Sequence, residues 1–151
     1  MPACRRAGVP VRGIIRPVSD ERPPSVFRDG GASYLHIPCH EPARAADFYE
    51  AVFGWSPRRD GDQPAFADAT GHVIGHFMRG EPAPGGTGVL PYIYVDDLTT
   101  ALRRVEENGG ALAEAPRPEG TLRVARIHDP EGNTVGVWTQ AGAGDAPAPG
   151  A

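Results

Sequence analysis

Histidine and tyrosine side chains gather on two short stretches that alternate as β-strands do. In "SYLHIPC", Tyr34 and His36 share one face, and in "LPYIYVDD", Tyr92 and Tyr94 share one face. An imidazole beside phenols can act as a general base, or it can bind a ligand carbonyl or acid group. The same pattern is also typical of polar residues that line a wet cavity without chemistry. His36 is therefore our candidate for a catalytic base and, more broadly, for a ligand contact.

Arg126 and His128 share one face of a later strand-like segment, "LRVARIH". A guanidinium and an imidazole on a cavity wall could contact an anionic ligand, whereas exposed residues at a sheet edge are the alternative. His36 with His128 is also the pair that could form a non-standard metal site, but two histidines without a carboxylate at a readable spacing give little support to it.

Two segments of the first half of the chain are similar in sequence to two segments of the second half. "ADATGHVIGHF" (67–77) matches "HDPEGNTVGVW" (128–138), with Gly75 over Gly136 and Phe77 over Trp138, at an offset of 136 − 75 = 61. "HEPARAADFYEAVFGW" lies over "DDLTTALRRVEENGGA" at an offset of 96 − 40 = 56. Two internal sequence matches that occur in the same order indicate one duplicated module.

Each module is predicted to run strand, helix and three strands. One helix begins near Pro42, which suits a first turn, and ends at Gly54; the other has Asp97 as N-cap and Gly109 as its stop. The helices need an apolar strand face to cover, so we expect a core that includes Leu35, Ile37, Ile74, Ile93, Val95, Val135 and Val137. By alternation, His76 is predicted to face the helices. The opposite faces would line a curved, open sheet whose concavity is a natural ligand site.

Composition excludes several classes of partner. The formal charge is −4 over 151 residues, which gives no support to a nucleic-acid or anionic-membrane partner. Two cysteines, Cys4 and Cys39, are too few for a disulfide framework, so we expect a protein of the reducing cytoplasm. No apolar run approaches the roughly 18 residues of a membrane span.

Proline, arginine and low-complexity segments mark the ends of the folded part. We predict a disordered N-terminal extension over 1–30, one domain over 31–140 with modules at 33–80 and 89–140, and a disordered tail over 141–151.

The motifs "FYEAVFGW", "YIYVDDL", "NGG" and "DPEGNTVGVW" resemble those of the vicinal oxygen chelate superfamily. This group contains glyoxalases, extradiol dioxygenases and bleomycin-resistance proteins, and the resemblance covers roughly residues 33–140. It implies an α+β fold in which two βαβββ modules form an open, cup-shaped mixed sheet with helices on the outer face. It also implies a homodimer with cups near the interface.

The resemblance implies a divalent metal held by His, Glu or Gln from four strands, and the four places fall here on Tyr34, Gly75, Leu90 and Gly136. None is an ordinary ligand, and a catalytic metal needs about three protein ligands. We therefore expect no metal cofactor, with a divalent metal at a non-standard site as the alternative. The two glycines would leave room for a ligand or for a neighbouring aromatic ring; easier strand coiling is the other explanation.

The residues predicted to share the cup face form the predicted ligand pocket. They are Tyr34, His36, Gly75, Phe77, Leu90, Tyr92, Tyr94, Arg126, His128, Gly136 and Trp138. The favoured hypothesis is a glyoxalase- or bleomycin-resistance-like protein that binds a small apolar or aromatic molecule without metal. The alternatives are a lyase, isomerase or dioxygenase with a non-standard metal or His36 as base, and a non-catalytic interaction module.

Overall fold

The computed structural model describes residues 25–82 and 88–142. The disorder predicted for the two ends falls largely outside these ranges, on residues 1–24 and 143–151. Within the described part, no helix is long and apolar enough to cross a membrane.

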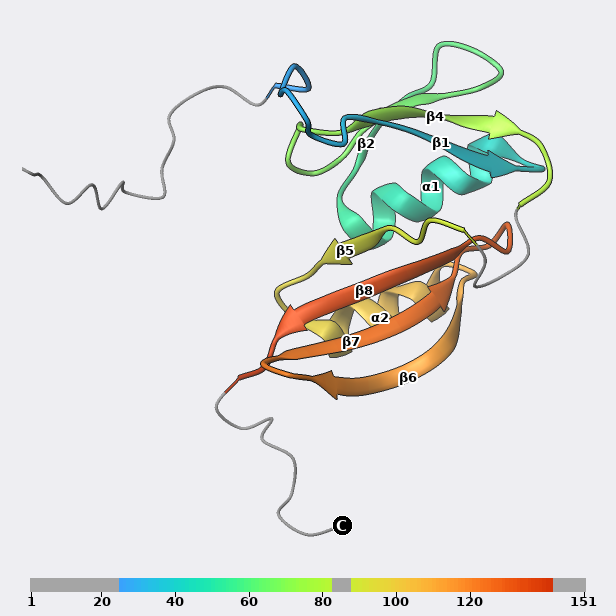
Figure 1. The fold of residues 1–151 in the computed structure, drawn as a ribbon. Coiled ribbons are helices and arrows are strands. Elements are labelled where there is room, and N and C mark those ends of the chain that lie inside the picture. Colours follow the sequence, from blue (N-terminus) through green and yellow to red (C-terminus); the bar gives the residue numbers. More distant parts are fainter. Residues whose placement is uncertain (1–24, 83–87, 143–151) are drawn as a thin grey trace, which may run out of the picture.

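Two modules of the same plan make up the described chain (Figure 1). The first comprises β1 (Tyr34–Cys39), α1 (Pro42–Phe53), β2 (Ser56–Arg58), β3 (Ala65–Ala67) and β4 (Ile74–Arg79). The second comprises β5 (Tyr92–Tyr94), α2 (Leu98–Glu107), β6 (Ala111–Glu119), β7 (Leu122–His128) and β8 (Thr134–Gln140). The first sheet has the order β1-β4-β3-β2 and the second has β5-β8-β7-β6, with the β1–β4 and β5–β8 pairs parallel and the rest antiparallel. The predicted α+β fold of two βαβββ modules with open mixed sheets is confirmed.

Local sequence signals set the helix ends. Pro42 occupies the first turn of α1, and Gly54 ends it in the left-handed conformation at φ 69°. Asp97 caps α2, since its carboxylate accepts the Thr100 N–H at 3.0 Å. Gly109, at φ 87°, follows the end of α2. These ends agree with the prediction from the sequence.

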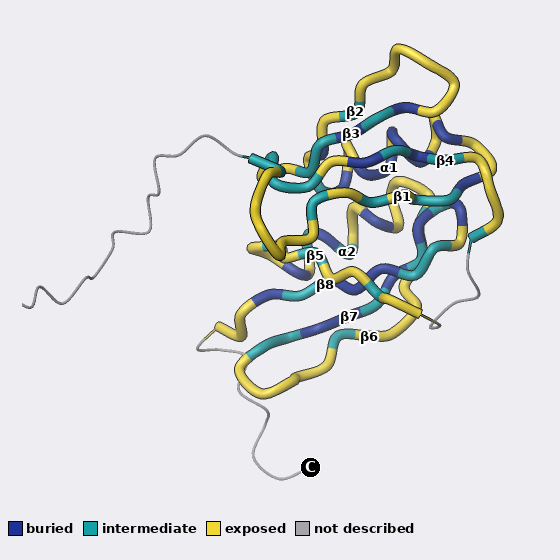
Figure 2. The backbone as a smooth tube through the Cα atoms, turned by 45° about the horizontal axis from the view of Figure 1, so that its top comes forward, coloured by how far each residue is buried: buried dark blue, intermediate teal, exposed yellow. Residues whose placement is uncertain are grey.

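The helices cover one face of each sheet, and the buried core lies between them and the strands (Figure 2). Val135 and Val137 are buried as predicted, and four more of the expected core residues are partly buried against this core: Leu35, Ile37, Ile93 and Val95. Ile74 is the exception, because it is 36% exposed on the face away from α1. We call the helix-free face of each sheet its open face.

A single extra residue in the turn before β4 explains the error at Ile74. The Asp68 N–H donates to Val73 O at 2.8 Å and closes a turn of 73 − 68 = 5 steps, while the Asp129 N–H donates to Asn133 O at 2.9 Å across 133 − 129 = 4 steps. The offset between the modules therefore falls from 61 to 60 after the turn. A shift of one residue turns every strand side chain to the other face, so β4 presents the opposite set from the one predicted.

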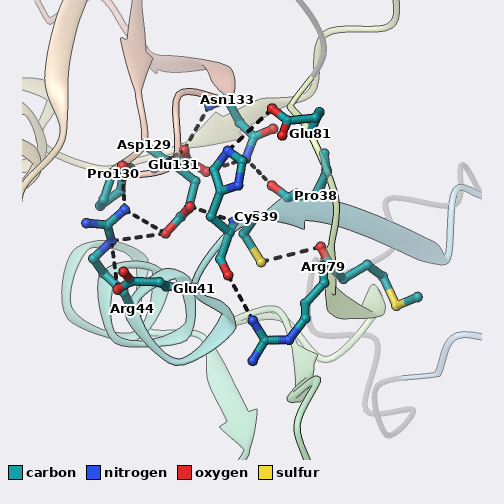
Figure 3. A network of polar contacts seen from close by, with 12 residues as sticks. Pro38, Cys39, Glu41, Arg44, Arg79, Glu81, Asp129, Pro130, Glu131 and Asn133 are labelled. Carbon is teal, nitrogen blue, oxygen red and sulfur yellow. Dashed lines mark hydrogen bonds and ion pairs between the residues drawn. The ribbon is translucent and has the colours of Figure 1, made fainter.

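A buried carboxylate joins the second module to the first (Figure 3). Asp129, in the turn between β7 and β8, is 3% exposed, and its Oδ2 accepts the Tyr49 hydroxyl of α1 at 2.9 Å. The Asn133 side chain donates to the same carboxylate and to Pro38 O of β1, at 2.9 and 2.8 Å. Burial raises the pKa of Asp129, against the effect of these hydrogen bonds.

Glu131 adds an ion pair to the same junction. Its side chain is fully buried, and it accepts the His40 N–H at 2.8 Å and the Arg44 guanidinium at 2.9 Å. Burial opposes its ionisation, but the hydrogen bonds from His40 and Arg44 outweigh burial and lower the pKa of Glu131. The junction therefore carries one carboxylate that is stabilised as the anion.

Glu131→Gln should lower the free energy of unfolding by about 2 kcal/mol at pH 7, because the acceptor loses its charge and one of its two accepting oxygens becomes an NH2 group. The pKa of Glu131 is lowered in the folded state, so its contribution is present above its ordinary value of 4.5 and lost as pH falls through the folded value. The difference between the variant and the parent should accordingly shrink below pH 4.5 in urea titrations.

Glu41→Gln is the matched control, since Glu41 contacts the same Arg44 at 3.8 Å but is 68% exposed. Its cost should stay below about 0.5 kcal/mol. Equal losses in the two variants, or a Glu131 effect that does not depend on pH, would contradict this account of the junction.

Candidate functional site

Tyr34, His36 and His76 come together on the open face of the first sheet. The β1–β4 register places His36 directly beside His76, and the Tyr34 hydroxyl hydrogen-bonds to His76 Nδ1. The Tyr34 ring also meets the His36 ring edge-on, with centroids 5.2 Å apart. The prediction that His76 faces the helices is wrong, because the longer turn before β4 rotates it to the open face.

The open face of the second sheet carries most of the predicted pocket. Tyr94 and Trp138 form an edge-to-face pair with ring centroids 5.0 Å apart. A hydrogen bond with Asp96 raises the pKa of Tyr94 above its ordinary value. His128 lies on the same face and contacts Thr134 Oγ1 at 3.3 Å. Leu90 precedes β5 and is half-buried.

Gly75 and Phe77, predicted on the cup face, lie on the core face of β4 instead. Phe77 is fully buried, with its ring 4.8 Å from that of Phe66 and 5.5 Å from that of Tyr49. A Cβ at Gly75 would lie 2.0 Å from Leu35 O and 2.5 Å from the Phe66 ring. Gly75 is therefore a packing residue beside β1, and the one-residue turn extension again gives the reason.

Gly136 lies on the open face, and an aromatic ring occupies the space above it. A Cβ there would come within 2.3 Å of the Tyr92 ring, which belongs to the neighbouring strand β5. The glycine has no left-handed backbone angle that would explain it. Of the predicted alternatives, room for a neighbouring ring is the one that the structure shows.

Tyr92 reaches across Gly136 to Arg126 of β7, whose Nε donates to the Tyr92 hydroxyl at 3.2 Å. Arg126 also pairs with Glu114 Oε1 at 3.1 Å. The hydrogen bond with Tyr92 and the charge of Glu114 raise the pKa of Arg126, which stays a cation. The sequence indicated Arg126 but gave no signal for Tyr92 or Glu114 as its partners.

Surface hollows in the described part of the chain are lined mainly by residues outside these faces. One, of about 400 Å³, is lined by the start of α1 together with Asp62 and Arg79. The other, of about 460 Å³, lies between the end of α1 and the start of α2 and reaches Tyr94 alone among the predicted pocket residues.

Comparison with known proteins identifies this architecture. Residues 31–137 match the family described as the Glyoxalase/Bleomycin resistance protein/Dioxygenase superfamily. The chain belongs to this superfamily. A glyoxylase-like domain-containing protein of Didymella fabae is 31% identical over 123 residues, covering 75% of this chain and 96% of the relative. The putative glyoxylase CFP32 of Mycobacterium bovis is 27% identical over 76% of this chain. The match covers only 47% of that relative, so the chain spans about half of its length.

Solved structures of the superfamily share the fold. A family enzyme from Burkholderia phytofirmans has a TM-score of 0.59 at 20% identity, covering 72% of this chain and 97% of that one. The fosfomycin resistance protein FosX from Mesorhizobium loti has a TM-score of 0.60 at 18% identity, covering 76% and 95%.

The four superfamily ligand places do not fit a divalent metal in this chain. The corrected register replaces Gly75 by His76, so the places hold Tyr34, His76, Leu90 and Gly136, which offer one imidazole and no carboxylate. No group of three His, Cys, Asp or Glu side chains in residues 25–82 and 88–142 is arranged to hold an ion. The predicted pair of His36 and His128 lies on different sheets.

The two glycines should respond differently to alanine. Gly75→Ala places a methyl group against backbone and a buried ring, and should cost about 2 kcal/mol or more in free energy of unfolding. For Gly136→Ala the three nearest atoms all belong to the Tyr92 ring, whose residue is 40% exposed and can rotate away, so its cost should be smaller, about 1 kcal/mol. Urea denaturation of the two variants measures both values.

The double variant Gly136→Ala with Tyr92→Ala supplies the control. Without the ring, alanine at position 136 should be neutral or slightly stabilising relative to Tyr92→Ala alone, since alanine suits a strand better than glycine. A Gly75→Ala protein as stable as the parent would contradict the core-face position of Gly75.

Proposed function

We propose that this protein binds a small apolar or aromatic molecule on its open sheet faces without the divalent metal usual in the superfamily. The observation that carries the proposal is the content of the four ligand places. Tyr34 and His76 are hydrogen-bonded to each other, Leu90 has no donor, and the Tyr92 ring covers Gly136. Contacts made by tyrosine side chains thus occupy the positions at which relatives would bind a metal ion.

Exposed aromatic surface supports binding of this kind. Tyr34, Tyr92 and Tyr94 are 48%, 40% and 47% exposed, although their strands belong to packed sheets. Tyr34 lies beside the His36 ring and Tyr94 beside the Trp138 ring. Exposed apolar patches of this kind mark interaction sites, and tyrosine presents an apolar ring together with a polar group. We expect the protein to act in the cytoplasm.

A second candidate function is an enzyme that moves a proton, as a lyase or isomerase does. The contact that favours it is the Tyr34–His76 hydrogen bond beside His36, because a phenol and two imidazoles could share a proton with a bound substrate. Here His36 is the candidate base.

Purified protein without a histidine tag should contain less than stoichiometric zinc, iron, manganese or nickel. Small aromatic compounds should raise its melting temperature in proportion to ln(1 + [L]/Kd). Trp138→Ala should abolish the shift, whereas Phe27→Ala, which removes an aromatic ring 94% exposed outside the sheets, should not.

Each departure from this result has a clear meaning. A stoichiometric metal would overturn the metal-free proposal and favour the enzyme. A complete lack of stabilising compounds would overturn ligand binding and leave an interaction module.

We further propose that a second copy of the chain completes the cup, because the open faces are broad and partly apolar. Light scattering should give twice the chain mass of 16.0 kDa. Ile74→Glu, at an apolar side chain 36% exposed on the open face, should give monomers, whereas Phe27→Glu should not. A monomeric parent protein would contradict this part of the proposal.

A further inference from the structure

Arg126 occupies the middle of the open face of the second sheet, on a strand next to β8. It lies directly opposite Gly136, and Tyr92 lies opposite the same glycine on the other side. Tyr92 and Arg126 are thus two strands apart, about 9–10 Å between backbones. Only a position without a side chain lets the Tyr92 ring lie flat across β8 and bring its hydroxyl to Arg126 Nε.

Counting donors shows what this contact leaves available. The Tyr92 hydroxyl accepts from Arg126 Nε, so its own hydrogen remains to be donated. Glu114 takes a hydrogen bond from Nη1, and in the planar guanidinium Nη2 shares an edge with Nε. The Tyr92 O–H and the Arg126 Nη2–H groups therefore lie next to each other, on side chains that both reach solvent.

Two adjacent donors, one of them cationic, match the two oxygens of a carboxylate. Tyr94 and Trp138 are the next open-face residues along β5 and β8, and successive residues of one strand face are about 7 Å apart. An aromatic pair therefore stands one step from the donor pair. We infer that this face binds an aromatic carboxylic acid with a short spacer, its carboxylate on Arg126 and Tyr92 and its ring against Tyr94 and Trp138.

This inference rests on the proposed small-molecule function and names its ligand class. Glu114 has a defined part in it, because its carboxylate holds the far side of the guanidinium and opposes the ligand charge. Glu114 is 45% exposed on the edge strand β6, so it can be neutralised without disturbing the core. Removing its charge should strengthen binding of the acid, the reverse of the effect expected for Arg126.

The test compares 3-phenylpropionate with the neutral 3-phenylpropanamide by isothermal titration calorimetry on the full chain. The parent should bind the acid about tenfold more tightly than the amide, as a charge-assisted hydrogen bond predicts. Arg126→Gln should remove this preference, and Glu114→Gln should increase affinity for the acid alone. Tyr92→Phe keeps the ring and should reduce the preference by removing one donor.

Arg103→Gln is the control, since Arg103 is exposed on α2 and pairs only weakly with Glu107 at 3.6 Å; it should leave both affinities unchanged. Circular dichroism melts establish that each variant is folded. Equal binding of acid and amide by the parent would overturn the carboxylate clamp while the proposed function stands. Binding of neither, with other aromatic compounds still stabilising the protein, would overturn the ligand class; failure of every compound would overturn the proposed function as well.

Discussion

The carboxylate of Asp129 is the contact on which the relation between the two modules depends. Its Oδ1 accepts the Glu131 and Asn133 N–H groups of its own turn, and its Oδ2 accepts the Tyr49 hydroxyl from the other module. The Asn133 side-chain amide donates a fourth hydrogen bond, to Oδ2. Burial raises the pKa of Asp129 and makes the anion costly, so the four hydrogen bonds are needed to keep it inside. Because Asn133 also donates to Pro38 O, the turn that starts β8 is fixed against the end of β1. This junction therefore helps to set how the two sheets, and with them their open faces, lie relative to each other.

Local signals in the sequence were enough for the elements but not for the face of every strand. Pro42, Gly54 and Asp97 act within one helical turn, so the helix ends were predicted correctly. The face of β4 depends instead on the closing bond of the preceding turn, from the Asp68 N–H to Val73 O. Gly71 and Gly132 align well, with φ of 73° and 92°, which hides the extra residue that follows in the first module. An alignment of the two modules through these glycines therefore assigns Gly75 to the open face and His76 to the helix-covered face, the reverse of the structure.

The candidate site also has features that the sequence predicted and features that it could not predict. Alternation correctly paired Gly136 with Trp138 within β8 and Arg126 with His128 within β7, because no turn intervenes within a strand. The β7–β8 register then shows that both pairs lie on one face, which the sequence had left open. The contact of Tyr92 with Arg126 could not be predicted, since it needs the strand order β5-β8-β7, and that order is a property of the folded sheet. Glu114 was missed for the same reason: it belongs to a fourth strand, which carries a register shift on either side of it.

The two modules differ at one equivalent position, which holds His76 in the first and Gly136 in the second. In the first module the imidazole is present, and the Tyr34 hydroxyl hydrogen-bonds to it. In the second module the equivalent residue, Gly136, has no side chain. The Tyr92 ring therefore crosses β8 above it, and its hydroxyl accepts a hydrogen bond from the charged guanidinium of Arg126. A shared ion would require both positions to point donors at one centre. Each module instead turns its tyrosine toward its own partner, so the open faces of the two sheets differ in their side chains and in their hydrogen bonds.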